Sequence, residues 1–470
     1  MNMAVESPHS ISAPSDKLDF KRVLPIFVIV LTGLLGLTII IPLLPLYAAS
    51  YGADPFVIGL LGATYPIMQF IGAPVLGRLS DRFGRKPVLL VSQLGTVIGF
   101  LLMGFAGSIW MLFLARIIDG LSGANISTAQ AAITDSTTEK TRTQGLGLIG
   151  AAFGIGFTIG PVVAFATLAV TGNSYQAVAF VAAAFAAIAF GLTWFWFEES
   201  LSPERRGHAE RKPALSLAAM LAALRRPAIG FLLALMFAQQ MVFGGFEQLL
   251  SLFTLSRLGL DARGNAVLFV IIGAVVVVIQ GGLIGRLSRR YGDRWLIVMG
   301  LASLAAGMIL MALTPNQAAP WYSREQVVFE LTGRSGRTLP GETPPTQQVP
   351  VTLPEEGNTG WLGIAWGLTA MVVASIGGAV LSPAINSSIT RRVDPSEVGG
   401  MLGLSASFVS AANALAPVLG GALFNWFGAS APFLVAGLVT AVLWWVAMRW
   451  INLSPPHTND ATPSVVASHG

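Results

Sequence analysis

The chain contains no cysteine and only four histidines. Without cysteine, disulfides, iron–sulfur clusters and thiolate zinc sites are excluded. The histidines all lie in polar segments outside the apolar runs, at His9, His208, His457 and His469. We therefore expect no metal site, no cofactor, and no histidine that transfers protons within an apolar run.

Charged residues are also scarce. They make up 11% of the 470 residues, whereas an ordinary soluble domain carries about 25%. Hydrophobic residues account for 54%, and the mean hydropathy is +0.69. A chain this apolar cannot hide its surface from water in one soluble core, so the composition predicts an integral membrane protein.

Long apolar runs take the place of the missing charges. A membrane-spanning helix needs about 20 apolar residues, and the sequence predicts an all-α integral membrane fold with twelve such helices. The predicted spans are residues 23–49, 56–79, 86–107, 109–135, 144–169, 175–197, 227–256, 264–288, 294–315, 361–389, 397–424 and 430–451. The first run is too long for a cleaved signal peptide.

Basic residues orient these spans. With a cytoplasmic amino terminus, 22 of the 28 lysines and arginines fall on the cytoplasmic side and five outside, and Arg116 lies within a span. Basic loops stay in the cytoplasm. We therefore expect a multi-pass protein of a cell membrane, the bacterial inner membrane, with both termini cytoplasmic. The net charge of +5 then reflects orientation and indicates no nucleic-acid partner.

The polar segments divide the chain into two six-helix bundles. The expected parts are a cytoplasmic tail (1–22), a first bundle (23–198), a cytoplasmic linker (199–226), a second bundle (227–451) and a second tail (452–470). An insert at 316–360 is expected outside the membrane as a small hairpin or loose cap. This expectation rests on two β-prone runs, Gln326–Leu331 and Gln347–Leu353.

A charged turn, Gly77–Pro87, separates the second and third spans. Gly84 can adopt a positive φ and end the incoming helix, and Pro87 is tolerated in the first turn of the next helix. The turn recurs as Gly285–Gly292, 208 residues later, and Gly160–Ala164 matches Ala416–Gly420 at an offset of 256. One insertion in the second half explains the difference, so the sequence indicates a duplicated unit.

The charged turn resembles the signature loop of the major facilitator superfamily. The matching positions are Gly77, Asp81, Arg82, Gly84, Arg85 and Lys86. The resemblance implies a carrier whose two halves rock about a central site, as internal repeats also suggest. It further implies that Asp81 holds the amino end of the eleventh span when the inner side is closed. Arg289 stands at the corresponding position of the second copy, so we expect a one-sided lock.

A second stretch resembles the helix-5 motif of the proton-coupled antiporter branch of this superfamily. It comprises Gly147, Gly156, Gly160 and Pro161. Ordinary packing of small residues is the alternative interpretation. Residues 65–70 and 131–136 are most similar to tetracycline-efflux-type members, which carry acids in helices 1 and 3. Thr32 and Gly99 stand at those positions here, so tetracycline is not the expected substrate.

Three charged residues fall deep within predicted spans: Arg116, Asp119 and Glu247. A charge within the membrane is a candidate for function. Arg116 and Asp119 can pair on one helix face, either as a structural pair or, as the resemblance implies for Arg116, in proton handling. Apolar surroundings favour the neutral form of Glu247. We expect it to be the proton site, with a packing role as the alternative.

The cavity should suit an amphiphilic, largely hydrophobic molecule, because no dense cluster of polar residues is present. The candidate lining residues are Phe27, Tyr65, Gln69, Gln239, Gln240, Phe243, Phe246, Asn386 and Asn413. The expected partners are a small-molecule substrate, protons and the lipid bilayer, and the expected state is a monomer.

Three classes of function are compared. We expect a proton-coupled exporter of the multidrug type; the rival is an importer, symporter or facilitator of a specific metabolite on the same fold. The third class, an intramembrane enzyme or receptor, is not expected, because the spans contain no histidine, no metal ligands and no nucleophile–base spacing. The dinucleotide-like run Gly145–Gly150 follows a charged loop instead of a strand, and no phosphate-binding loop for ATP occurs.

Overall fold

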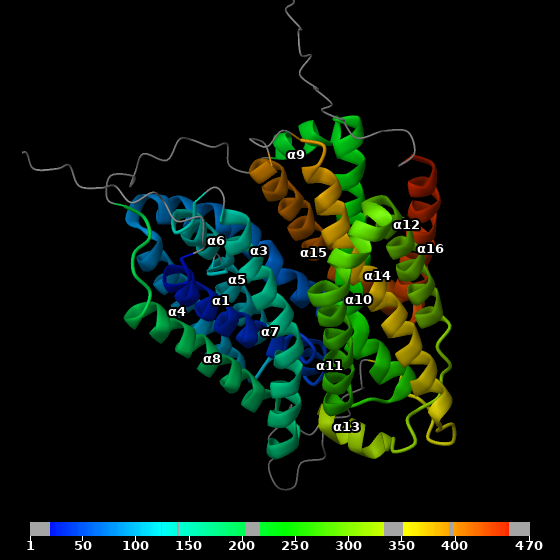
Figure 1. The fold of residues 1–470 in the computed structure, drawn as a ribbon. Helices are drawn as coiled ribbons and strands as arrows, with labels where there is room; N and C mark the ends of the chain where they lie inside the picture. The colour runs from blue at the N-terminus through cyan, green and yellow to red at the C-terminus, as the bar shows by residue number, and fades with distance from the viewer. Residues whose placement is uncertain are drawn as a thin grey trace, which may run out of the picture.

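The computed structural model describes residues 19–123, 125–138, 141–202, 217–332, 351–393 and 398–450, and these are almost wholly helical (Figure 1). The first half of the structure comprises α1 (Phe20–Ile40), α2 (Leu44–Ala49), α3 (Pro55–Phe83), α4 (Arg85–Gly104), α5 (Ile109–Leu121), α6 (Asn125–Asp135), α7 (Arg142–Thr171) and α8 (Tyr175–Phe195). A short helix, α9 (Leu217–Leu224), follows.

The second half comprises α10 (Pro227–Leu258), α11 (Ala262–Val278), the π-helical turn η2 (Ile279–Leu283), α12 (Ile284–Ala312), α13 (Arg324–Thr332), α14 (Trp361–Thr390), α15 (Val398–Phe427) and α16 (Ala431–Trp450). Nearly all of the predicted terminal tails and about half of the predicted linker lie outside the described residues. The predicted division into domains therefore stays a prediction.

Eleven helices of the described residues are long and apolar enough to cross a membrane. The predicted number was twelve. The difference arises at Ala262–Ala312, which forms one helical stretch of 51 residues. At a rise of 1.5 Å per residue such a stretch would far exceed a bilayer of about 30 Å. Gly292 breaks it with a φ of 79°, between the predicted spans 264–288 and 294–315.

Two predicted spans are interrupted. The first ends as a regular helix at Ile40 and continues as α2 after a turn at 41–43. The backbone nitrogens of Pro42 and Pro45 carry no hydrogen, so they cannot donate the hydrogen bonds that a continuous helix requires. The fourth span is divided into α5 and α6, and Ser122 closes the end of α5 by donating its backbone N–H to the carbonyl of Ile118.

The two halves meet near α13 and diverge toward α9 (Figure 1). Their main contacts join α3 to α15 and α7 to α11. We call these two ends of the molecule the α13 end and the α9 end. At the α13 end, a Cβ added to Gly62 would lie 3.2 Å from the Pro417 Cβ, and one added to Gly273 would lie 2.7 Å from the Phe157 carbonyl oxygen. Glycines therefore let the halves close tightly there.

The insert between α12 and α14 differs from its prediction. Its first β-prone run, Gln326–Leu331, lies within helix α13, so the expectation of a strand was wrong. Val327 and Leu331 are four residues apart and both buried, as on one face of a helix. Most of the second run lies outside the described residues, and residues 351–353 form no strand. A single β-bridge joins Ala318 to Thr359 at the base of the insert.

Candidate functional site

Glu247 lies in α10 on the side that faces the first half. On α10, its neighbour Gln248 approaches Gly62 of α3, and Ser251 donates a hydrogen bond of 2.6 Å to the carbonyl of Pro42. Glu247 is half-buried. It forms no hydrogen bond or ion pair with any residue that the structure describes. It is therefore an acid next to the junction of the halves, without a basic partner among those residues.

The opposite side of α10 lines an apolar cavity of about 310 Å³. Helices α15 and α16 supply much of its remaining wall, including the half-exposed Leu419 and Val439. The α10 residues of this wall are Phe237, Ala238, Met241, Val242, Gly245, Phe246 and Leu249. At 100° per residue these positions point on average away from Glu247. Glu247 thus does not belong to the apolar surface that α10, α15 and α16 share.

The first half contains a second charged cluster, around Arg116 and Asp119 of α5. Their side chains are 4% exposed and pair at 2.8 Å, as the spacing predicted. Asp119 is also hydrogen-bonded to Thr96 of α4, and the Arg116 guanidinium lies 5.4 Å from the centre of the Tyr65 ring. The Arg116 Nε is buried without a hydrogen-bond partner among the described residues. The pair is thus enclosed by α3, α4 and α5.

Two of the proposed cavity residues belong to the surroundings of this pair. Gln69 donates to the Tyr65 hydroxyl at 3.3 Å and to the carbonyl of Gly123 at 2.8 Å, which fixes α3 to the end of α5. A cavity of about 40 Å³, large enough for a water molecule, lies beside Asp119 and is lined in part by Tyr65 and Gln93. Tyr65 and Gln69 therefore lie in the first-half cluster.

Gly99 packs directly against Asp119. A Cβ at position 99 would lie 2.9 Å from the Asp119 Cβ and 3.0 Å from the Ala115 carbonyl. Position 99 is where the tetracycline exporters that this chain resembles carry an acid. Here Asp119 occupies the adjacent space from α5, so a side chain at position 99 would need the helices to move apart.

The remaining cavity candidates lie mostly in the second half and form separate pairs. Gln240 donates to Asn413 at 2.9 Å, and Ser405 donates to Asn386 at 2.9 Å. Gln239 is buried, and its side-chain oxygen has no partner among the described residues. The Phe243 and Phe246 rings lie 5.8 Å apart, whereas Phe27 packs in the core of the first half. These residues do not converge on one polar site.

The charged turn of the first half is organised by Arg85. Gly84 has a φ of 107° and ends α3, as predicted. The Arg85 guanidinium bonds the Ser80 hydroxyl at 2.7 Å, Asp81 at 2.6 Å and Asp135 at 2.9 Å. Among the described residues, Asp81 has no hydrogen bond or ion pair with the second half. Residues 394–397, next to the amino end of the eleventh span, lie outside the described residues, so the proposed contact of Asp81 with that end stays a prediction.

Of the remaining residues of the predicted gating loop, Arg82 is exposed, whereas Gly77 and Lys86 are half-buried. Gly77 has no atom within 4 Å of an added Cβ. The Arg82 guanidinium lies 5.3 Å from the Phe83 ring. The backbone N–H groups of Arg85 and Lys86 donate to the Glu199 carboxylate at 2.8 and 3.2 Å. Glu199, which follows α8, thereby caps the start of α4, a role that the local sequence did not indicate.

The second copy of the turn carries the opposite charges. The offset of 208 places Asp293 at the position of Arg85, and the offset of 256 places Arg391 at that of Asp135. The Asp293 carboxylate accepts from Ser288 and Ser387, both at 2.5 Å, and pairs with Arg391 at 3.3 Å. Ser288 corresponds to Ser80. The Ser288 hydroxyl donates to Asp293, whereas the Ser80 hydroxyl accepts from Arg85. The alignment of the two copies alone had indicated only that Arg289 stands where the first copy has Asp81.

The antiporter-like motif packs α7 against α1. Thr38 of α1 donates to the carbonyl of Gly156 at 2.9 Å, and a Cβ on Gly160 would collide with the Thr38 side chain. Pro161 lies within the continuous helix α7, as does Gly147. These contacts are within the first half, while α7 also contacts α11 of the second half. No group of three acidic or histidine side chains suited to a metal ion occurs in the described ranges.

Comparisons with known proteins agree over most of the length. A family model described as Major Facilitator Superfamily matches residues 26–329 and 359–467. The chain is similar to a class H tetracycline resistance protein from Pasteurella multocida, with 24% identity over 92% of both chains. It is also similar to multidrug resistance protein 2 from Bacillus subtilis (strain 168), with 27% identity over 90% of this chain and 95% of that one.

A solved structure shows the same fold. It is that of a bacterial homolog to the human lysosomal transporter Spinster, with a TM-score of 0.67 and 15% sequence identity. The likeness covers 93% of this chain and 98% of that one.

Proposed function

The chain belongs to the Major Facilitator Superfamily, and we propose that it exports hydrophobic or amphiphilic small molecules in exchange for protons by alternating access. The relatives named for tetracycline and multidrug resistance support export, because their similarity extends over nearly the whole chain. The helices are those of a multi-pass membrane protein.

The proposed orientation places the α9 end in the cytoplasm, as the distribution of lysine and arginine favours. The halves meet at the α13 end, so the structure then corresponds to the inward-facing state. Transport requires the opposite arrangement as well, in which the halves separate at the α13 end and approach each other at the α9 end. The duplicated architecture supports such rocking.

The observation that carries the proposal is the unpaired acid at the junction of the halves. Glu247 lies on the α10 face that contacts the turn between α1 and α2, and α3, through its neighbours. In this role its carboxylate takes up a proton from the outside and releases it inward, and substrate and proton exclude each other. The membrane potential contributes about 2.3 kcal/mol per charge per 100 mV. Arg116 and Asp119 form the proposed second element of proton coupling.

The test is a Glu247→Gln variant in proteoliposomes under an imposed pH gradient, assayed with a panel of amphiphilic dyes and drugs. We expect proton-driven transport to be lost, while exchange of substrate without a gradient persists, because the amide cannot bind or release the proton. Glu355→Gln is the matched control, since Glu355 is exposed and lies outside the spans. Undiminished proton-driven transport in Glu247→Gln would show that the assignment is wrong.

The same assay addresses the rival function. An exporter moves substrate against the direction of proton flow and dissipates the gradient when substrate is added. Uptake of one defined metabolite together with protons would instead identify a symporter on this fold.

A further inference from the structure

The base of the insert is fixed to the second half. The Ala319 N–H donates to the Leu258 carbonyl at 2.9 Å, and the Ser256 hydroxyl donates to the Thr352 carbonyl at 3.0 Å. Within the insert, the Tyr322 hydroxyl donates to the Pro354 carbonyl at 3.2 Å. These bonds make the insert move with α10, whose last turn supplies two of the partners.

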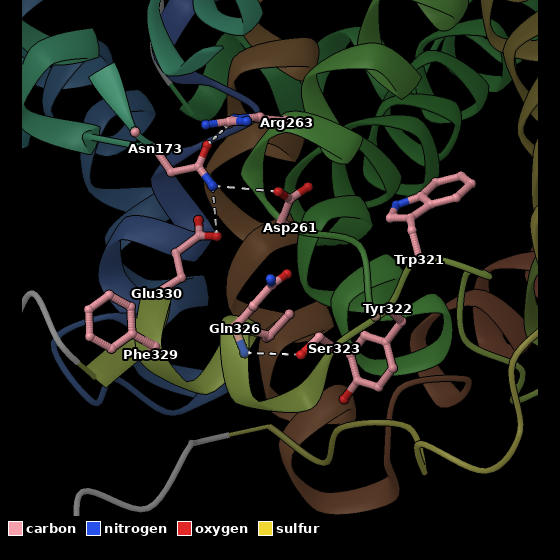
Figure 2. Close-up of a pocket in the computed structure, with 12 residues that line it drawn as sticks. Asn173, Asp261, Arg263, Trp321, Tyr322, Ser323, Gln326, Phe329 and Glu330 are labelled. Atoms are coloured by element: carbon pink, nitrogen blue, oxygen red, sulfur yellow. Dashed lines mark hydrogen bonds between the residues drawn. The ribbon is translucent and has the colours of Figure 1, made fainter. Parts of the chain in front are cut away.

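The helix of the insert, α13, reaches across to the first half (Figure 2). It contacts α2, and its Glu330 carboxylate accepts from the Asn173 amide at 3.0 Å and from the Tyr175 hydroxyl at 2.8 Å. Asn173 and Tyr175 lie in the turn between α7 and α8 and at the start of α8. A helix fixed to one half therefore binds a turn that belongs to the other.

The α10–α11 loop and the start of α11 hold the same turn from a second direction. The Arg263 Nε donates to the Asn173 side-chain oxygen at 2.5 Å, and its Nη2 donates to the Leu168 carbonyl at 3.4 Å. The Asn173 amide also lies 3.5 Å from Asp261 (Figure 2). All donors and acceptors of the Asn173 side chain are thus directed at the second half or its insert.

The backbone at this turn is built to present Asn173. Gly172 and Asn173 have φ values of 63° and 64°, and Asn173 is the one residue other than glycine with a positive φ among those that the structure describes. Asparagine tolerates this conformation better than most residues. Two left-handed residues in succession turn the chain sharply after α7 and direct the Asn173 side chain toward α13.

We propose that α13 is a latch for the gate at the α13 end. Glu330 and Arg263 bind the Asn173 turn while this end is closed, in the inward-facing state, and release the turn when this end opens. The proposal rests on alternating access as proposed above. Because these bonds join residues of opposite halves, separation of the halves must break them. The insert thereby stabilises the closed state of the α13 end.

The surroundings of the latch suit reversible binding. A pocket of about 400 Å³ lies beside it, lined by Asn173, Asp261, Gln326 and Glu330 among others. Water in such a pocket can replace each bond as it breaks, and exchanging a protein hydrogen bond for one with water changes the free energy little.

The first test uses the absence of cysteine from the chain. Gln248→Cys places a single thiol where α10 faces Gly62 at the junction of the halves. Its reaction with a membrane-impermeant maleimide is measured from the α13 side. In Glu330→Ala and Asn173→Gly we expect labelling to be at least about fivefold faster, the effect of losing one average hydrogen bond. Glycine keeps the left-handed backbone at position 173.

Glu325→Gln and Phe329→Ala are the matched controls. Both residues are exposed on α13. Among the described residues, neither forms a hydrogen bond, ion pair or ring contact with the first half, so labelling should not change. Unchanged labelling in both latch variants would overturn the proposal. Because the readout involves no proton, failure of the proton mechanism at Glu247 would leave it unaffected.

A cross-link between residues 173 and 330 tests whether the latch must open during transport. In the Asn173→Cys, Glu330→Cys double variant, a short bifunctional methanethiosulfonate, which forms a disulfide with each thiol, should stop transport, and reduction of the disulfides should restore it. Either single variant treated in the same way should keep its activity. Full transport by the cross-linked protein would show that the two residues need not separate, which contradicts the proposal.

Discussion

The buried pair of Arg116 and Asp119 shows how a charged residue is accommodated within the membrane. Both side chains are almost fully enclosed, and Thr96 and Tyr65 complete their surroundings. Taking two charges out of water is costly, and the pair recovers that cost only while both partners are present. Its presence in the first half is therefore consistent with either a structural role or a role in proton coupling.

Substitution of one or both partners separates these roles. We expect Asp119→Asn to lower the free energy of unfolding by about 3–5 kcal/mol, because it leaves an uncompensated buried charge. The double variant Arg116→Met, Asp119→Val should recover most of that loss, as apolar replacements of buried ion pairs often do. Thermal unfolding in detergent measures both effects.

Transport by the double variant then decides the role of the pair. A stable double variant that has lost proton-driven transport would assign the pair to coupling. A stable double variant with full activity would make it a structural element.

The sequence was sufficient to predict this pair but not its surroundings. A spacing of three residues within one helix fixes the contact between Arg116 and Asp119. The contacts with Tyr65 and Thr96 depend on how α3 and α4 are rotated about their axes, which a single sequence of mostly apolar residues does not specify. The same limit explains why the predicted cavity residues divide into several separate groups.

At the scale of helices, the small residues of α7 set its distance from α1. Gly160→Ala places a methyl group against Thr38, so α1 and α7 must separate and their packing is weakened. Gly150 lies in the same helix, and a Cβ added there has no atom within 4 Å, so Gly150→Ala is the matched control. We expect a clearly lower Tm for Gly160→Ala and a Tm close to that of the parent for Gly150→Ala, measured in the same detergent.

Equal Tm values for the two variants would mean that α7 tolerates a methyl group on either face. The antiporter-like motif would then have no packing role at position 160.

Spans and turns were predictable because their signals are local. Apolar runs of sufficient length mark the spanning helices, and Gly84 ends α3 with the positive φ that its position in the turn suggested. The insert was expected to be a small hairpin or loose cap, and the expectation of a strand at residues 326–331 was wrong. These residues are β-prone, although Val327 and Leu331 are spaced as on a helix. Its docking on α2 involves residues almost 280 positions apart in the chain, and local patterns carry no such information.

At the scale of the whole molecule, two proposed contacts stabilise opposite conformations of the transporter. Asp81 is proposed to close the α9 end, and Glu330 the α13 end. Asp81→Asn should therefore favour the inward-facing state, whereas Glu330→Ala should favour the outward-facing state. In the double variant the two effects should largely cancel. Labelling of Gln248→Cys from the α13 side measures the balance in all three proteins.

Labelling of the double variant that equals that of Glu330→Ala alone would mean that Asp81 does not affect the same equilibrium. The two ends would then open independently, contrary to rigid rocking of the halves.

The inverted charges around Arg85 and Asp293 also limit how this gene can change. Buried Arg85 is paired with Asp135 in the first copy, and buried Asp293 is paired with Arg391 in the second. Gene conversion that copied the start of α4 onto α12 would place an arginine at position 293, next to Arg391. The reverse transfer would place an aspartate at position 85, next to Asp81 and Asp135. The two copies can therefore no longer exchange segments freely, and each now evolves under its own constraint.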